Sequence, residues 1–79
     1  MIFTISYNNE LIEGYTFNEM YAKITSNKSL IMLLIKGEKY TGYREGNKIL
    51  EIGLWYIENR NLMYRAISKQ YKNKDGNII

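Results

Sequence analysis

Apolar and polar residues alternate near the start of the chain. Phe3, Ile5 and Tyr7 fall on one side of an extended segment, and small polar residues separate them. This period of two predicts a half-buried strand. The pair Asn8–Asn9 suits the positive-φ positions of a tight type I′ turn. Residues 10–15 then either return as a short second strand or form a loop.

The next segment carries the signature of a helix start. Thr16 and Glu19 form a capping box, in which the Thr hydroxyl accepts from the Glu19 amide and Glu19 reaches back. Four apolar residues follow at helical spacing and form one stripe: Phe17, Met20, Tyr21 and Ile24. We predict a helix over about residues 17–27. Three turns are too few to be stable alone, so this helix has to pack on a sheet.

Beyond the helix, the pattern favours a β meander over residues 30–71. The run Leu30–Ile35 is apolar on both faces, as in a central strand. The segment Lys36–Lys39 has Gly37 as its first central residue, which suits a two-residue type II′ turn. Further strands are predicted over residues 40–44, 48–57 and 62–71.

Residues 48–71 also fit a second interpretation, because several apolar residues lie near helical spacing, among them Ile52, Trp55 and Tyr56. Aromatic and β-branched residues are abundant here and alternate cleanly, which favours strands. Gly53 would also weaken a helix interior. We therefore expect strands in this region.

Together these elements predict one α+β domain over residues 1–71 and a polar C-terminal tail over 72–79. The expected fold is a mostly antiparallel sheet of five to six strands, with one short helix on one face. A strand that is apolar on both faces needs cover on both. Sheet curvature, a second copy or a partner has to supply the second cover, and we expect a homodimer.

Composition limits the chemistry. The chain has no Cys and no His, so the usual general base, the strongest nucleophile and the common zinc ligands are absent. Its Asp and Glu residues show no paired-carboxylate pattern and no calcium loop, and its glycines form no phosphate-binding motif. We expect no enzymatic activity, no catalytic residue, no cofactor and no metal site.

Composition also indicates a compartment and a source. The longest apolar run has six residues, whereas a membrane span needs about 20. The first residues carry no basic region typical of a signal peptide. We expect a soluble cytoplasmic protein that does not enter a membrane. Ile, Asn, Lys and Tyr are abundant, and AT-rich codons encode them, which indicates a low-GC bacterium or one of its phages or plasmids.

Aromatic residues supply the candidate binding site. The chain has eight Tyr and one Trp, and such side chains offer large contact areas with a polar tip. Along residues 48–57 one face is apolar throughout and is expected to pack under the helix, which would turn Trp55 outward. The connection at 58–61 decides which of Tyr64 and Arg65 joins it. The candidate partner-binding residues are Trp55, Tyr56, Tyr64, Arg65, Tyr43, Arg44 and Lys69.

These features lead to three hypotheses of function. The first is a small inhibitor or regulator that binds a host protein or nucleoprotein complex. In size and composition the chain resembles the accessory proteins of phages and mobile elements, such as anti-CRISPR and other anti-defence proteins. The second is a nucleic-acid-binding module that stacks bases on strand tyrosines beside basic residues. The third is a carboxylate hydrolase. A net charge of only +3 favours the first over the second.

Overall fold

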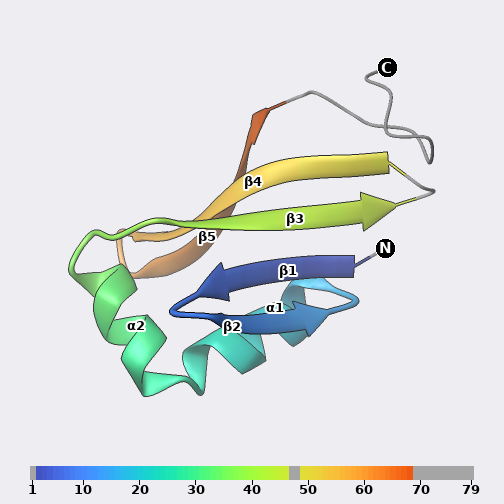
Figure 1. The fold of residues 1–79 in the computed structure, drawn as a ribbon. Coiled ribbons are helices and arrows are strands. Elements are labelled where there is room, and N and C mark those ends of the chain that lie inside the picture. Colours follow the sequence, from blue (N-terminus) through green and yellow to red (C-terminus); the bar gives the residue numbers. More distant parts are fainter. Residues whose placement is uncertain (1, 47–48, 69–79) are drawn as a thin grey trace.

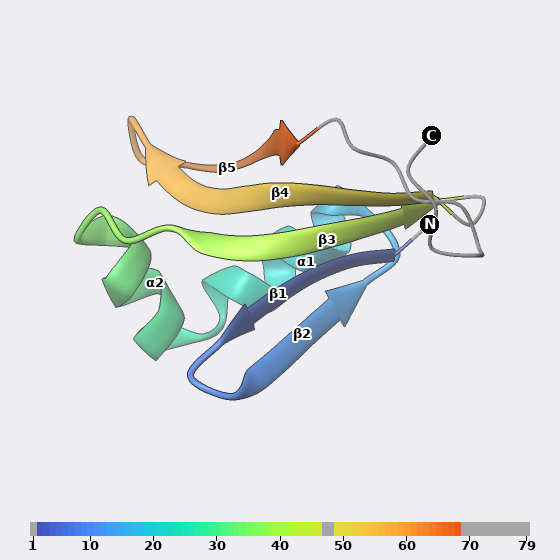
Figure 2. The ribbon, with the colours of Figure 1, turned by 45° about the horizontal axis from the view of Figure 1, so that its top comes forward.

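A computed structural model of the chain describes residues 2–46 and 49–68. Five antiparallel strands form one open sheet in the order β2-β1-β3-β4-β5, and two helices lie on one of its faces (Figures 1 and 2). The α+β class and the antiparallel five-stranded sheet are confirmed. The elements are β1 (Ile2–Tyr7), β2 (Glu10–Gly14), α1 (Phe17–Thr25), α2 (Lys28–Ile35), β3 (Tyr40–Gly46), β4 (Ile49–Glu58) and β5 (Asn61–Ser68).

A two-residue turn joins β1 to β2. Asn8 and Asn9 adopt φ angles of 45° and 64°, and Tyr7 pairs with Glu10 across the hairpin. Asparagine tolerates the left-handed region better than most residues. The predicted type of turn is therefore confirmed, and the following segment is a strand rather than a loop.

Helix α1 begins where its capping box predicts. The Glu19 amide donates to the Thr16 hydroxyl at 3.0 Å, and the Glu19 carboxylate accepts from the amide of Tyr15. The first bond satisfies a backbone donor that a helix start leaves without a partner, and the second ties Glu19 to the residue before the N-cap. Met20 and Ile24 lie one turn apart and are fully buried against the sheet.

Replacing Thr16 with alanine is expected to lower the free energy of unfolding by about 1 kcal/mol, because the Glu19 amide loses its acceptor. Urea denaturation measures the change. Asn18→Ala is the control, because Asn18 is exposed in the same helical turn and does not cap it. Equal midpoints for the Thr16 variant and the unmodified protein would contradict the cap.

The strand predicted over Leu30–Ile35 is wrong, because this segment forms helix α2. The Asn27 side chain caps the helix by accepting from the Leu30 amide at 3.1 Å. Leu and Met favour helices, and Leu30 and Leu34 are both fully buried on its inner side. The fold thus has two helices instead of one. The expected homodimer loses its original argument, which required a strand that was apolar on both faces.

The predicted turn around Gly37 is also wrong, because Gly37 ends helix α2. Its φ angle is 95°. The Gly37 amide donates to the Leu34 carbonyl and the Glu38 amide donates to the Leu33 carbonyl, each at 3.1 Å. This pair of bonds is a Schellman motif, which favours glycine at its left-handed position. The meander therefore begins at β3 and not at residue 30.

The strands of the second half are confirmed and the helical interpretation is excluded. Strand β4 pairs with β3 on one side and with β5 on the other (Figure 1). Asn59 and Arg60 have φ angles of 50° and 67°, and Glu58 pairs with Asn61, so the connection has two residues. The last part of the predicted strand to 71 and the tail over 72–79 lie outside the described residues.

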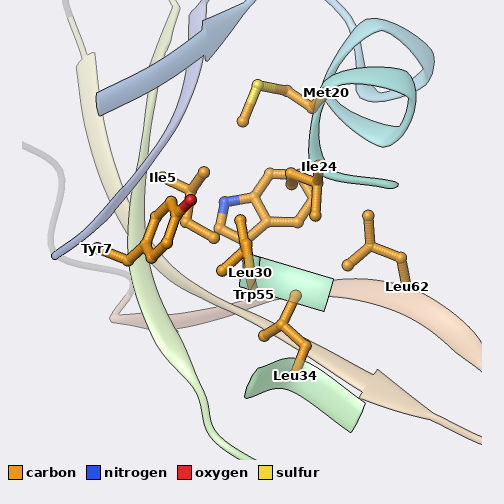
Figure 3. Packing of buried hydrophobic residues seen from close by; sticks show 8 residues of the cluster. All are labelled: Ile5, Tyr7, Met20, Ile24, Leu30, Leu34, Trp55 and Leu62. Carbon is orange, nitrogen blue, oxygen red and sulfur yellow. The ribbon is translucent and has the colours of Figure 1, made fainter. Parts of the chain in front are cut away.

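The hydrophobic core lies between the helices and the inner face of the sheet (Figure 3). Strands and helices each contribute half of its buried side chains. Trp55 occupies its centre in Figure 3 and is fully buried. The core consists of Ile5, Tyr7, Met20, Ile24, Leu30, Leu34, Trp55 and Leu62.

Candidate outer-face binding site

Strand register divides the candidate residues between the two faces of the sheet. Trp55 pairs with Tyr40 on one side and with Tyr64 on the other, so these three residues share the helix-covered face. The alternate residues of the same strands point the other way. Tyr43, Tyr56 and Arg65 therefore share the face opposite the helices: Tyr43 pairs with Ile52, Tyr56 with Met63 and Arg65 with Leu54.

The prediction that Trp55 faces outward is wrong. Its side chain is 0% exposed, and its indole Nε1 donates to the carbonyl of Thr4 at 2.8 Å. A buried indole needs such an acceptor. The apolar side of β4 that was expected under the helices, with Ile52 and Leu54, is the outer side. Trp55 is thus a core residue in this structure.

Two glycines make room for the aromatic rings of the inner face. Gly42 and Gly53 pair with each other across β3 and β4. A Cβ on Gly42 would collide with the Thr4 carbonyl oxygen and the Trp55 indole, and a Cβ on Gly53 would collide with the Tyr64 ring. The rings therefore lie directly on the sheet backbone, as large side chains do over strand glycines.

Tyr64 belongs to an aromatic cluster around Trp55. The Tyr64 ring is tilted against Trp55 at a centroid distance of 4.9 Å, and Phe17 stacks on Trp55 at 5.7 Å. Phe3 meets both Trp55 and Tyr64 edge to face, at 6.1 and 5.5 Å. Such pairs add to the energy of burial. The cluster assigns Tyr64 a packing role.

Arg44 also lies on the inner side, where its guanidinium is 5.6 Å from the centroid of the Phe3 ring. It pairs with Glu51 in the register of β3 and β4. The Tyr64 hydroxyl donates to Glu51 Oε1 at 3.3 Å. The structure therefore separates Arg44 and Tyr64 from the outward candidates. Lys69 lies outside the described residues.

We call the surface opposite the helices on β3, β4 and β5 the outer sheet face. Among the described residues, no helix covers it (Figures 1 and 2). Tyr43 is 39% exposed and Met63 is 38% exposed. Between them lie Ile52, Leu54 and Tyr56, which we call the apolar stripe of β4. The members of the outer sheet face are Lys39, Thr41, Tyr43, Glu45, Ile52, Leu54, Tyr56, Glu58, Met63 and Arg65. The Leu50 side chain lies outside the described part.

The outer sheet face is slightly hollowed between β4 and β5. The hollow has a volume of about 320 Å³, and Leu54, Tyr56 and Arg65 are among the residues that line it. The Lys39 ammonium lies 5.8 Å from the centroid of the Tyr56 ring, which holds a cation against the apolar stripe. Leu54 was not among the predicted site residues because its face of β4 was expected to pack under the helix. Lys39 and Met63 were not predicted either: Lys39 was assigned to a turn, and the register of residues 62–71 was left open.

Tyr7, the last residue of β1, and Tyr40, the first residue of β3, have raised pKa values. Burial is the main cause of the raised pKa of Tyr7, and a hydrogen bond with Glu10 adds to it, while Asn27 opposes it. The pKa of Tyr40 is raised chiefly by its hydrogen bond to Glu38. Their rings meet edge to face at 5.7 Å. Both phenols therefore stay protonated well into alkaline pH.

The described residues offer no gathered set of acidic ligands. Within residues 2–46 and 49–68, no three Asp or Glu side chains converge where they could hold a metal ion. Neither helix of this part has the length and apolar character needed to cross a membrane. A second hollow, between β2 and the junction of the helices, includes Lys23, but the ammonium of this lysine already donates to the Glu13 carbonyl.

The structure thus brings three of the predicted residues, Tyr43, Tyr56 and Arg65, onto one uncovered surface. Aromatic and arginine side chains are enriched at the centres of protein interfaces. Tyr56 is part of the apolar stripe of β4, and Tyr43 and Arg65 flank it on β3 and β5. No protein-family model, no curated protein and no solved structure matches this chain, so its function has to be inferred from the geometry of this face.

Proposed function

We propose that the chain is a non-enzymatic binding protein whose outer sheet face docks on a target protein and inhibits or regulates it. One observation carries the proposal. Three adjacent strands present an apolar stripe with exposed aromatic and sulfur side chains on the face that the helices leave uncovered. A small domain has little apolar surface to spare, and an uncovered apolar face is typical of an interaction site.

The side chains of this face suit protein binding. Tyr43 and Tyr56 provide rigid aromatic area with a polar tip, and Met63 adapts its shape to a partner. Arg65 stands on the edge strand β5, where a guanidinium can reach carboxylates or carbonyls of a partner. Binding energy in such interfaces concentrates in a few large anchors.

The charges of the face favour a protein over a nucleic acid. Lys39 and Arg65 carry positive charge, and Glu45 and Glu58 balance them on the same surface. Affinity for a phosphate backbone increases with the number of cations that contact it. The AT-rich composition supports a phage or mobile-element source, in which case the target is a host protein or nucleoprotein complex.

Tyr56→Ala and Tyr43→Ala are each expected to weaken target binding by about 2 kcal/mol, because each removes a large anchor. The measurement is affinity capture from nuclease-treated lysate of a low-GC bacterium, followed by titration of the captured protein with each variant. Tyr15→Ala is the matched control, since Tyr15 is 70% exposed and lies away from this face, between β2 and α1.

A target that both outer-face variants lose and the Tyr15 variant keeps would support the proposal. A target that all three variants bind equally would contradict it. Capture that disappears with nuclease treatment, together with salt-sensitive binding to single-stranded oligonucleotides, would instead support the nucleic-acid-binding alternative.

A further inference from the structure

Strand β3 carries opposite charges at the two ends of its outer side. Lys39, directly before the strand, and Glu45, near its end, are both exposed. Glu45 lies on the outer sheet face by its register, and Lys39 by its contact with the Tyr56 ring. Thr41 and Tyr43 stand between them on the same side. The order along the outer side of this strand is therefore cation, Thr, Tyr, carboxylate.

This order is complementary to itself in the antiparallel direction. If two copies face each other about a two-fold axis between Thr41 and Tyr43, Lys39 of each copy stands opposite Glu45 of the other. The same axis places Thr41 opposite Tyr43. A two-fold interface requires such self-complementarity, because the same patch serves both subunits.

The side chains of the neighbouring strand β4 are also compatible with this two-fold axis. Leu54 pairs with Thr41 and Ile52 pairs with Tyr43 in the sheet register, so the axis also places Leu54 of one copy against Ile52 of the other. Apolar side chains of β4 then meet apolar side chains at the centre of the interface. Arg65 lies on edge strand β5, and thus at the rim of the interface, where its charge stays in water.

The dimensions of two packed sheets permit the charge pairs. Sheets that pack face to face lie about 10 Å apart, which a lysine and a glutamate side chain can bridge together. The distance from Lys39 to Glu45 along the strand is about 20 Å, and three strands are about 15 Å wide. A face of this size is smaller than the interfaces of stable complexes, so we expect the association to be weak and reversible.

We propose that the outer sheet face pairs with the same face of a second copy about this two-fold axis. The dimer covers the surface that the target would use, so target binding requires the dimer to dissociate. Only this regulatory consequence rests on the proposed function; the pairing itself rests on the charge order of β3 and the apolar stripe of β4.

Sedimentation equilibrium from about 1 µM to about 1 mM tests the pairing. Lys39→Glu and Glu45→Lys are each expected to weaken association about tenfold or more, because each reversal places like charges opposite each other at two symmetric positions. The double variant, with both charges exchanged, restores opposite charges and is expected to recover dimerisation. Leu54→Asp is expected to abolish it.

Lys28→Glu is the matched control for Lys39→Glu, because it changes the net charge by the same amount at an exposed position of α2. It is expected to leave association unchanged. A chain that stays monomeric over the whole range would overturn the pairing, as would a dimer that both single reversals leave intact.

The pairing and the proposed function can fail separately. A monomeric chain that still loses its target on Tyr56→Ala would contradict the dimer and support the docking face. A dimer that responds to the charge exchange, in a protein without a target that depends on this face, would support the pairing and contradict the proposed function.

Discussion

Replacing Gly42 with alanine is expected to lower the free energy of unfolding by about 3 kcal/mol. The added methyl group would collide with the Thr4 carbonyl oxygen and with the Trp55 indole. The carbonyl is backbone in the neighbouring strand, and Trp55 is held by its bond to that same carbonyl. Neither group can move without opening the contact between β1 and β3, so no small rearrangement can relieve the collision.

Gly53→Ala is the matched control, because Gly53 pairs with Gly42 in the same sheet row. The atoms nearest to its methyl group would belong to Tyr64, a half-buried side chain on the edge strand. The Tyr64 ring can rotate away, so the expected loss is about 1 kcal/mol. Urea denaturation of both variants measures the difference. Equal losses would show that the indole does not lie over Gly42.

Trp55→Ala is expected to lose about 3–5 kcal/mol, the range for removing a buried aromatic side chain. The stability of a domain this short is on the order of 5 kcal/mol, so about 0–2 kcal/mol is expected to remain, and up to about half of the molecules are expected to be unfolded at room temperature. Trp55 is fully buried and contacts rings from β1, α1 and β5. Its removal therefore weakens the packing between α1 and the sheet.

Trp55→Phe is the informative second variant, because it keeps an aromatic ring and removes the hydrogen bond to Thr4. We expect it to remain folded with an intermediate loss of stability, measured by the same denaturation series and by the amide NMR spectrum. A Trp55→Ala protein that keeps the stability of the unmodified protein and loses only its target would contradict the core position and restore Trp55 as a surface anchor.

The sequence alone determined the elements whose signals are local. Thr16 and Glu19 form their cap through residues three apart, so the start of α1 needs no tertiary information. The same holds for the turn at Asn8–Asn9. Alternation and β-branched residues were sufficient to predict β4 and β5. The α+β class followed from the short helix and the strands around it.

The run Leu30–Ile35 could not be assigned by periodicity, because six consecutive apolar residues fit a buried strand and a buried helix equally well. Two local signals did favour the helix: Asn27 stands at its N-cap and Gly37 directly follows its C-cap, Lys36. Gly37 also fits a hairpin turn, and only the position of the segment against the sheet decided between the two. There, Leu30 and Leu34 fill the core from one side.

The direction of Trp55 was decided by tertiary structure alone. On β4 the alternate residues Ile52, Leu54 and Tyr56 form the more uniformly apolar side, yet that side is the uncovered one. The helix-covered side contains Gly53, and the glycine pair across β3 and β4 creates a space that the Trp55 indole and the Tyr64 ring fill together. Which face of a strand is buried depends on what the opposing layer can pack against, and alternation within one strand carries no information about that layer.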